Sequence, residues 1–227
     1  MAERQTILVT GAAEALQRFP NVDGLVLSVG AFLQDGPTVL PNGHEAMFAA
    51  NVLGPFLFTE ILSEKLKARH GLVAHVIAPF REQLDWDDLE GFRVRRPMVA
   101  FNRQKVCNRV IAGEMARRYP GQICSVAYDP AFVLDKSDPD LKKRWPKGFA
   151  GFVWSAASLL FARHPSVAGE PLAELMLTGD RDALNGAMVK LNKRVARLDR
   201  AMSDTALGSR LWQELQERTG LAQAGRE

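Results

Sequence analysis

The chain has 227 residues and a formal net charge of +3, with 47% hydrophobic and 24% charged residues, which suits one globular unit with a full core. No segment reaches the roughly 18 consecutive apolar residues of a membrane span, and the N-terminus lacks the pattern of a signal peptide. The basic clusters lack interleaved aromatics, so we expect solvated faces and no nucleic-acid partner. Cys107 and Cys124 are expected to be buried free thiols, and the protein to be cytoplasmic.

Five short apolar runs predict β-strands. They are hydrophobic without strict alternation, which is typical of strands covered on both faces. Longer helical patterns separate them, and this βαβ series predicts an α/β fold with a doubly wound parallel sheet. In chain order, the strands are expected at residues 6–10, 24–30, 72–78, 122–128 and, more weakly, 172–179.

The segments between and after these strands carry helical patterns. We expect one domain over residues 1–180 and a helical extension over 181–227 that packs on it. Ligands of parallel sheets bind beyond the carboxyl ends of the strands, so the candidate site lies there. The helices are expected at 12–19, 43–68 with a bend at Pro55, 99–118, 148–161, and around 184–198 and 205–218.

Six stretches share their order with one known family. They are ILVTGA at 7–12, VDGLVLSVGAF at 22–32, NVLGPFLFTEIL at 51–62, LDWDDL at 84–89, AFNRQKVCN at 100–108 and LGSRLWQELQERTGL at 207–221. Through them the chain resembles the short-chain dehydrogenase/reductase family, in the branch similar to retinol dehydrogenases. The resemblance implies a Rossmann-like three-layer sandwich with helices on both faces of the sheet.

The nucleotide-binding half departs from the family's pattern. The family's turn Thr-Gly-x-x-x-Gly-x-Gly brings backbone amides to a pyrophosphate at a helix N-terminus, but Ala15 and Gln17 replace its later glycines here. Two further strands of the family are absent between Gly11 and Leu25. We therefore expect a truncated sheet of about five strands, with the first two as neighbours, and no bound cofactor.

The catalytic positions depart from the pattern as well. By the resemblance, Phe101 replaces the proton-donating tyrosine, and Ile77 to Pro79 stand where a serine closes the strand. Asp135 replaces a threonine that holds the nicotinamide amide. Asn51 and Lys105 keep the two other places of the catalytic set. Because phenylalanine has no proton to give, we predict that conventional NAD(P)-dependent reduction is lost.

Four polar residues are therefore the candidate catalytic residues: Lys105, Asp129, Tyr128 and Asn51. Lys105 is either a base with a lowered pKa, an anchor for an anionic substrate, or a solvated lysine. Asp129 is a general base or a turn aspartate before Pro130. Tyr128 supplies a phenol or packs in the core, and Asn51 holds a helix bend. No grouping has metal-ligand spacing, so we expect no metal site.

The hypothesis that follows is a cofactor-independent small-molecule enzyme with acid–base chemistry, of the isomerase, cyclase or lyase type, for example in natural-product biosynthesis. Two alternatives stay open: a catalytically silent scaffold or partner subunit, and an NAD(P)-dependent oxidoreductase with an atypical site. Apolar loops predict a fairly hydrophobic substrate. The family pairs the helices that correspond to 51–68 and 99–118 with another subunit, so the resemblance implies a homodimer or homotetramer.

Overall fold

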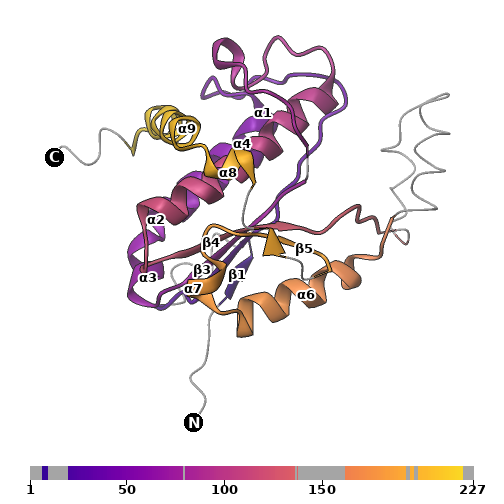
Figure 1. The fold of residues 1–227 in the computed structure, drawn as a ribbon. Coiled ribbons are helices and arrows are strands. Elements are labelled where there is room, and N and C mark those ends of the chain that lie inside the picture. Colours follow the sequence, from indigo (N-terminus) through magenta and orange to yellow (C-terminus); the bar gives the residue numbers. More distant parts are fainter. Residues whose placement is uncertain are drawn as a thin grey trace.

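The structure is a computed structural model that describes residues 7–9, 20–78, 80–135, 137, 162–192, 195–196 and 199–221 (Figure 1). Its sheet has the strand order β1-β2-β3-β4-β5-β6, in which the first five strands are parallel and the sixth is antiparallel. The strands are β1 Ile7–Val9, β2 Gly24–Leu27, β3 Leu72–Val76, β4 Cys124–Asp129, β5 Met188–Lys190 and β6 Val195–Ala196. The predicted parallel α/β sandwich with a shortened sheet is confirmed.

The first two strands are direct neighbours, with Ile7 opposite Gly24. This confirms the adjacency expected from the missing family strands. A parallel pair needs a crossover, and the segment between β1 and β2 is long enough for one short helix. The helix expected at 12–19 and the glycine-poor turn before it lie outside the described residues.

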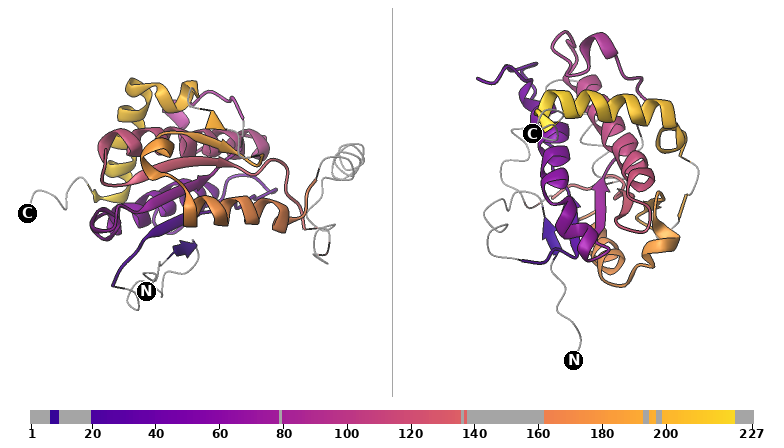
Figure 2. Two further views of the ribbon diagram at one scale, coloured as in Figure 1. Left: turned by 60° about the horizontal axis from the view of Figure 1, so that its bottom comes forward. Right: turned by 90° about the vertical axis from the view of Figure 1, so that its left-hand side faces the viewer.

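Helices cover the sheet on two faces, as the views of Figure 2 show. On one face lie α4 (Pro97–Arg118) and α9 (Thr205–Thr219), and on the other lies α6 (Pro165–Thr178). Separate hydrophobic clusters fill the two interfaces, one with Val73 and Val110, the other with Leu72 and Met176. The remaining elements are α1 Ala46–Phe48, α2 Gly54–Ile61, α3 Ser63–Ala68, α7 Arg181–Leu184, α8 Arg200–Ser203, the π-helix η2 Ala49–Leu53 and the 3₁₀-helix η3 Trp86–Asp88.

The strand expected at 172–179 is wrong, because this segment is the second half of α6. The helix begins with an N-cap at His164, whose ring nitrogen accepts from Ser166 N, and with Pro165 in its first turn. Its core-facing side chains are spaced three and four residues apart, which is helical spacing. They are Ala168, Leu172, Leu175 and Met176.

The helix expected around 184–198 is wrong as well. The chain turns at Gly186, whose φ of 74° favours glycine, and then forms β5 and β6. Met188 and Val189 are buried, and Val189 pairs with Tyr128 of β4. The last part of the chain thus extends the sheet before it forms α8 and α9. The helix expected at 205–218 is confirmed as α9.

The helix expected over 43–68 is interrupted, but not at Pro55. The backbone widens into the π-helix η2 one turn earlier, and Pro55 then lies in the first turn of α2, where its missing N–H costs nothing. A further break at Leu62 separates α2 from α3. π-helical turns are rare and often occur at functional sites, and η2 contains Asn51.

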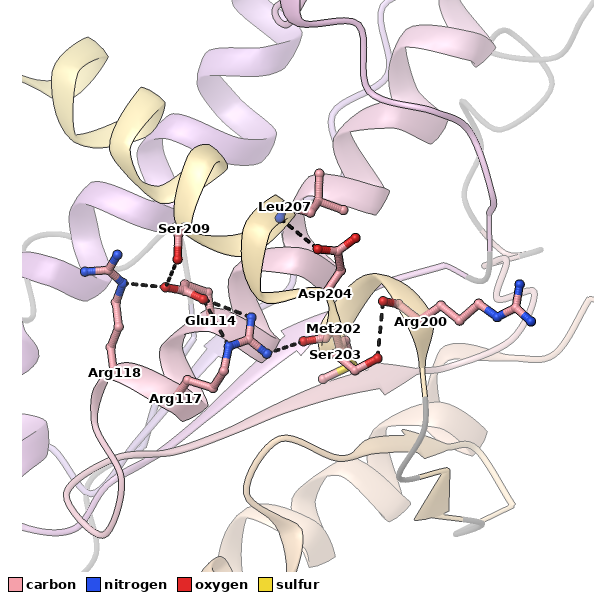
Figure 3. A network of polar contacts seen from close by, with 9 residues as sticks. All are labelled: Glu114, Arg117, Arg118, Arg200, Met202, Ser203, Asp204, Leu207 and Ser209. Carbon is pink, nitrogen blue, oxygen red and sulfur yellow. Dashed lines mark hydrogen bonds and ion pairs between the residues drawn. The ribbon is translucent and has the colours of Figure 1, made fainter.

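A network of polar contacts joins the C-terminal segment to α4 (Figure 3). The buried carboxylate of Glu114 accepts from Arg118 Nε at 2.8 Å and from Arg117 Nη2 at 2.9 Å, and Arg117 donates to the carbonyl of Met202. At Gly208, a Cβ would lie 2.6 Å from Glu114 Oε2, so α9 approaches α4 closely there. Apolar packing completes the contact, since Trp212 meets Phe56 edge to face at 4.9 Å between ring centroids.

No helix in the described residues has the length and apolar character to cross a bilayer. No group of three or more histidine, cysteine, aspartate or glutamate side chains is placed to hold a metal ion in this part of the chain. Cys107 and Cys124 are buried free thiols, as predicted.

Candidate functional site

The site predicted beyond the carboxyl ends of the strands is built from three segments. These are the loop that follows β2 at residues 28–32, the end of β3, and the first half of α4. The helix η2 lies beside them and contributes Asn51. Parallel strands end at one edge of their sheet, which is why segments far apart in the sequence meet here.

Lys105 lies at the centre of this site. Its residue is only 5% exposed, and its Nζ donates to the carbonyl of Val29 at 3.0 Å and to that of Val76 at 3.2 Å. No carboxylate pairs with it among the described residues. Burial therefore lowers the pKa of Lys105 from 10.5 to about 8, because desolvation penalises the charged form.

Asn51 organises the backbone around Lys105. Its side-chain oxygen accepts from Ala31 N at 2.7 Å, and its nitrogen donates to Ala31 O at 2.8 Å and to Gln104 Oε1 at 2.7 Å. These bonds tie the loop after β2 to α4. Asn51 is completely buried, and its bonds hold the loop that follows β2.

Apolar rings and side chains occupy the places of the family's proton donors. Phe101 lies one turn before Lys105, whose Nζ is 5.6 Å from the centre of its ring. Phe32 packs edge to face on Phe101 at 5.6 Å between ring centroids. Ile77 is buried at the end of β3. No hydroxyl group therefore stands at these positions, and Lys105 is the titratable group of the described site.

Tyr128 and Asp129 do not join Lys105. Adjacent strand residues point to opposite faces, and Tyr128 lies in the cluster on the α6 side, where its hydroxyl donates to the carbonyl of Ala168 at 2.7 Å. Burial raises the pKa of Tyr128. Asp129 Oδ1 accepts from Ala131 N at 2.9 Å, which is a turn role, and Ala131 has a φ of 60°. Both match the structural alternatives left open above.

Asp135, at the position expected to clamp a nicotinamide amide, is hydrogen-bonded within its own loop. The Asp135 carboxylate accepts from the Ser137 backbone at 2.9 Å and from its hydroxyl at 2.6 Å, and these bonds lower the pKa of Asp135. Sequence reasoning missed two other contributors, Gln104 and Phe32. Gln104 had a usable signal, because it precedes Lys105 on the helix that faces Asn51. The contact of Phe32 with Phe101 joins the loop after β2 to α4, and no sequence signal predicts it.

Several known proteins are similar to this chain in sequence. No protein-family model matches the sequence. A protein named daunorubicin C-13 ketoreductase DnrU, from Streptomyces sp. strain C5, is 31% identical over 117 residues, which cover 51% of this chain and 40% of that protein. Human retinol dehydrogenase 13 is 26% identical over 224 residues, covering 92% of this chain and 64% of its own length. The chain thus spans about 40% and 64% of the lengths of these two relatives.

Solved structures agree with the sequence relatives on the fold. A short-chain dehydrogenase/reductase of Saccharomyces cerevisiae superposes with a TM-score of 0.54 at 18% identity, covering 85% of this chain and 72% of that one. The NADP-bound angucycline C-6 ketoreductase LanV gives a TM-score of 0.54 at 18% identity, covering 79% of this chain and 65% of that one. The chain is similar in sequence to a ketoreductase and to retinol dehydrogenases, and similar in fold to short-chain dehydrogenases/reductases. Its shortened sheet is consistent with the partial coverage of these proteins.

This relationship corrects the functional hypothesis. The expected cofactor-independent isomerase, cyclase or lyase is wrong, since the relatives and structural neighbours with a named reaction are ketoreductases and dehydrogenases, several of them bound to NADP, NADPH or NADH. The geometry shows why the hypothesis failed. It needed Tyr128, Asp129 and Lys105 to converge on one pocket, and they do not.

The described residues fit the nicotinamide end of the family's cofactor in two respects. An ammonium has three N–H donors, and Lys105 uses two of them on carbonyls, so one is left for a ribose or carbonyl oxygen. Gly30 is exposed above it, and a Cβ there would lie 3.6 Å from Lys105 Nζ, so the approach to the ammonium is through bare backbone. The phosphate turn at 10–17 lies outside the described residues.

Proposed function

We propose that this chain is an NAD(P)-linked oxidoreductase of the ketoreductase type, in which Lys105 takes the place of the missing tyrosine as proton donor. The observation that carries the proposal is the buried Lys105 ammonium, with a pKa of about 8, at the carboxyl ends of β2 and β3. A general acid works best when its pKa lies near the operating pH. An ordinary lysine ammonium has too high a pKa to donate a proton readily near neutral pH. Desolvation lowers the pKa of Lys105 and makes it a stronger acid.

The hydrogen bonds of Lys105 allow it to lose one particular proton. A neutral amine keeps two N–H groups, and these match the carbonyls of Val29 and Val76. The third proton points away from both and is the one that transfers to a developing alkoxide. The nicotinamide, when bound, supplies the hydride. Asn51 keeps the loop that carries Val29 in place through its two bonds to Ala31.

A fairly hydrophobic carbonyl compound suits the surroundings of this site. The loops that follow β2 and precede α4, together with the first turn of α4, expose four apolar side chains to between 37% and 39%: Phe32, Leu33, Phe92 and Met98. DnrU is named for daunorubicin, and human retinol dehydrogenase 13 for retinol. Daunorubicin and retinal are therefore the first substrates to test.

The experiment begins with titration of the purified chain with NADPH and NADH, followed by nicotinamide fluorescence and thermal unfolding. A ligand at 100 times its Kd adds about 2.7 kcal/mol to the free energy of unfolding. Reduction of retinal and daunorubicin is then measured from pH 6 to pH 10. We expect the rate to fall as the pH rises through about 8, as Lys105 loses its proton.

Lys105→Met should abolish reduction, whereas the exposed control Lys190→Met should not change it. Turnover that survives Lys105→Met would show that Lys105 is not the acid. Absence of any shift with either nucleotide would favour a second candidate, a catalytically silent subunit. The contact of Phe32 with Phe101 favours that candidate, because it fills the place of the lost acid with apolar rings.

A homodimer or homotetramer through residues 51–68 and 99–118 stays part of the proposal, and its contacts would have to come from side chains of these segments that the fold does not bury. Phe56, Val110 and Met115 are buried in the cluster that also contains Leu211 and Trp212 of α9. These side chains are thus covered by the chain's own C-terminal helix. A cytoplasmic location likewise stays part of the proposal, and the two free thiols support it.

A further inference from the structure

An open cavity of about 770 Å³ lies on the side of α4 that faces the C-terminal segment, one turn beyond Lys105. Three segments enclose it: the loop at 81–86 after β3, the middle of α4, and residues 199–207 at α8 and the start of α9. Its volume falls in the range of about 300–1,000 Å³ typical of small-molecule sites. None of the four candidate catalytic residues lines it, so it is separate from the site described above.

The wall of the cavity combines an apolar surface with a buried cation. The apolar part consists of Leu84, Trp86, Val106 and Leu207. Arg109 supplies the cation, and only 7% of its side chain is exposed. The cavity therefore offers contact area for a hydrocarbon or ring system next to a desolvated positive charge.

The hydrogen-bonding capacity of Arg109 is only partly used. Its Nη2 donates to the carbonyl of Phe80 at 2.6 Å. Its Nε is buried without a hydrogen bond, although Asp199 Oδ1 lies 3.5 Å away. No partner for Nη1 is found among the described residues. A buried donor without a partner costs about 1–3 kcal/mol, and charged groups cost more, so an acceptor in the cavity would recover this energy.

Asp199 forms an ion pair with Arg109 but no hydrogen bond to its Nε, because the nearest carboxylate oxygen serves another element. Its Oδ1 accepts from the backbone N–H groups of Ala201 at 3.0 Å and Met202 at 3.1 Å, which caps α8. The same oxygen is the one nearest to Arg109. Across the whole lining, three arginines face two carboxylates, so the cavity keeps a positive excess that favours an anion.

We infer that this cavity binds a small amphipathic monocarboxylate, with its carboxylate on Arg109 and its apolar body against Trp86 and Leu207. Arginine presents paired N–H donors that match a carboxylate. The opposite face of the ligand meets Val106 of α4. The inference does not depend on the proposed oxidoreductase activity.

Decanoate is the probe, with decanol and decylamine as matched ligands of the same chain length. Binding to the full chain is measured by isothermal titration calorimetry, and tryptophan fluorescence is followed because Trp86 lines the cavity. We expect one decanoate per chain with a Kd on the order of 10 µM, and at least about tenfold weaker binding of decanol and decylamine. Equal affinity for decanol would overturn the role of the charge, and no saturation by decanoate below about 1 mM would overturn the site.

Two variants locate the site by different means. Arg109→Met removes the cation, and Leu207→Trp fills the cavity while leaving every charge in place. Both should weaken decanoate at least about tenfold. The control Arg118→Met lies on the same helix, but its guanidinium stacks on Trp212 outside the cavity, so binding should not change. Unchanged binding in Leu207→Trp would contradict the inference even if Arg109→Met did not fold.

Discussion

Lys105 and Glu114 are both buried charged residues of α4, and their surroundings differ in kind. Glu114 is matched by two arginines and a serine hydroxyl, so its charge is compensated within the fold. Among the described residues, the Lys105 ammonium contacts backbone carbonyls and the ring of Phe101 but no carboxylate, and burial lowers its pKa to about 8. The contacts of Glu114 hold α4 against the C-terminal segment. The surroundings of Lys105 instead lower the pKa of its ammonium and make it reactive.

The difference follows from what each half of α4 touches. The second half packs against α8 and α9, whose backbone and side chains come from the same chain and are always present. The first half faces the carboxyl ends of the strands, where a ligand is expected to complete the contacts. An uncompensated charge is tolerated in a fold where a ligand or a reaction uses it.

The largest effect is expected at the compensated charge. Glu114→Ala should lower the free energy of unfolding by about 4 kcal/mol, because it removes the charge-assisted hydrogen bonds that Arg117 and Arg118 donate to this buried carboxylate. Urea unfolding measures it. The control Glu217→Ala loses only an exposed bond to Gln213 and should cost about 0.5 kcal/mol. A loss at Glu114 as small as the control would mean that water replaces the carboxylate.

The helix α4 shows which parts of the candidate site could be predicted from the sequence. The parallel order of the strands predicted a site beyond their carboxyl ends, and Lys105 lies where β2 and β3 end. The partners of Lys105 were not predictable, because they are backbone carbonyls of Val29 and Val76, and no side chain marks them.

Two further predictions were wrong although the sequence contains evidence against them, and a third could not have been made from the sequence pattern. Tyr128 and Asp129 are adjacent in a strand, so the period of two already sends them to opposite faces. The segment 172–179 is rich in leucine, but His164 and Pro165 before it form a helix start. β5 has only three residues, too few for a pattern to distinguish it from a helix.

The second largest expected effect is a pH dependence of the free energy of unfolding, which the lowered pKa of Lys105 causes. Between pH 8 and pH 10.5 the unfolded chain keeps a proton that the folded chain has lost, so the free energy of unfolding rises with pH. At about 1.36 kcal/mol per pKa unit, the rise is about 3 kcal/mol. Urea unfolding of the unmodified chain and of Lys105→Met should therefore diverge over this interval. A constant difference between the two proteins from pH 7 to pH 10.5 would contradict the lowered pKa.

The smallest expected effect on stability is that of Gly30→Ala, which should change function without changing folding. A Cβ there would stand 3.6 Å from Lys105 Nζ and 4.0 Å from the Phe101 ring, which is ordinary contact, so Gly30→Ala should change the free energy of unfolding by less than about 0.5 kcal/mol. The methyl group nevertheless covers the approach to the third N–H of Lys105. NADPH affinity or ketone reduction should fall, while the control Gly169→Ala, with nothing within 4 Å, should leave both unchanged. If Gly30→Ala keeps full nucleotide binding and turnover, ligands do not reach Lys105 from this side, and an uncompensated charge on α4 has no functional partner there.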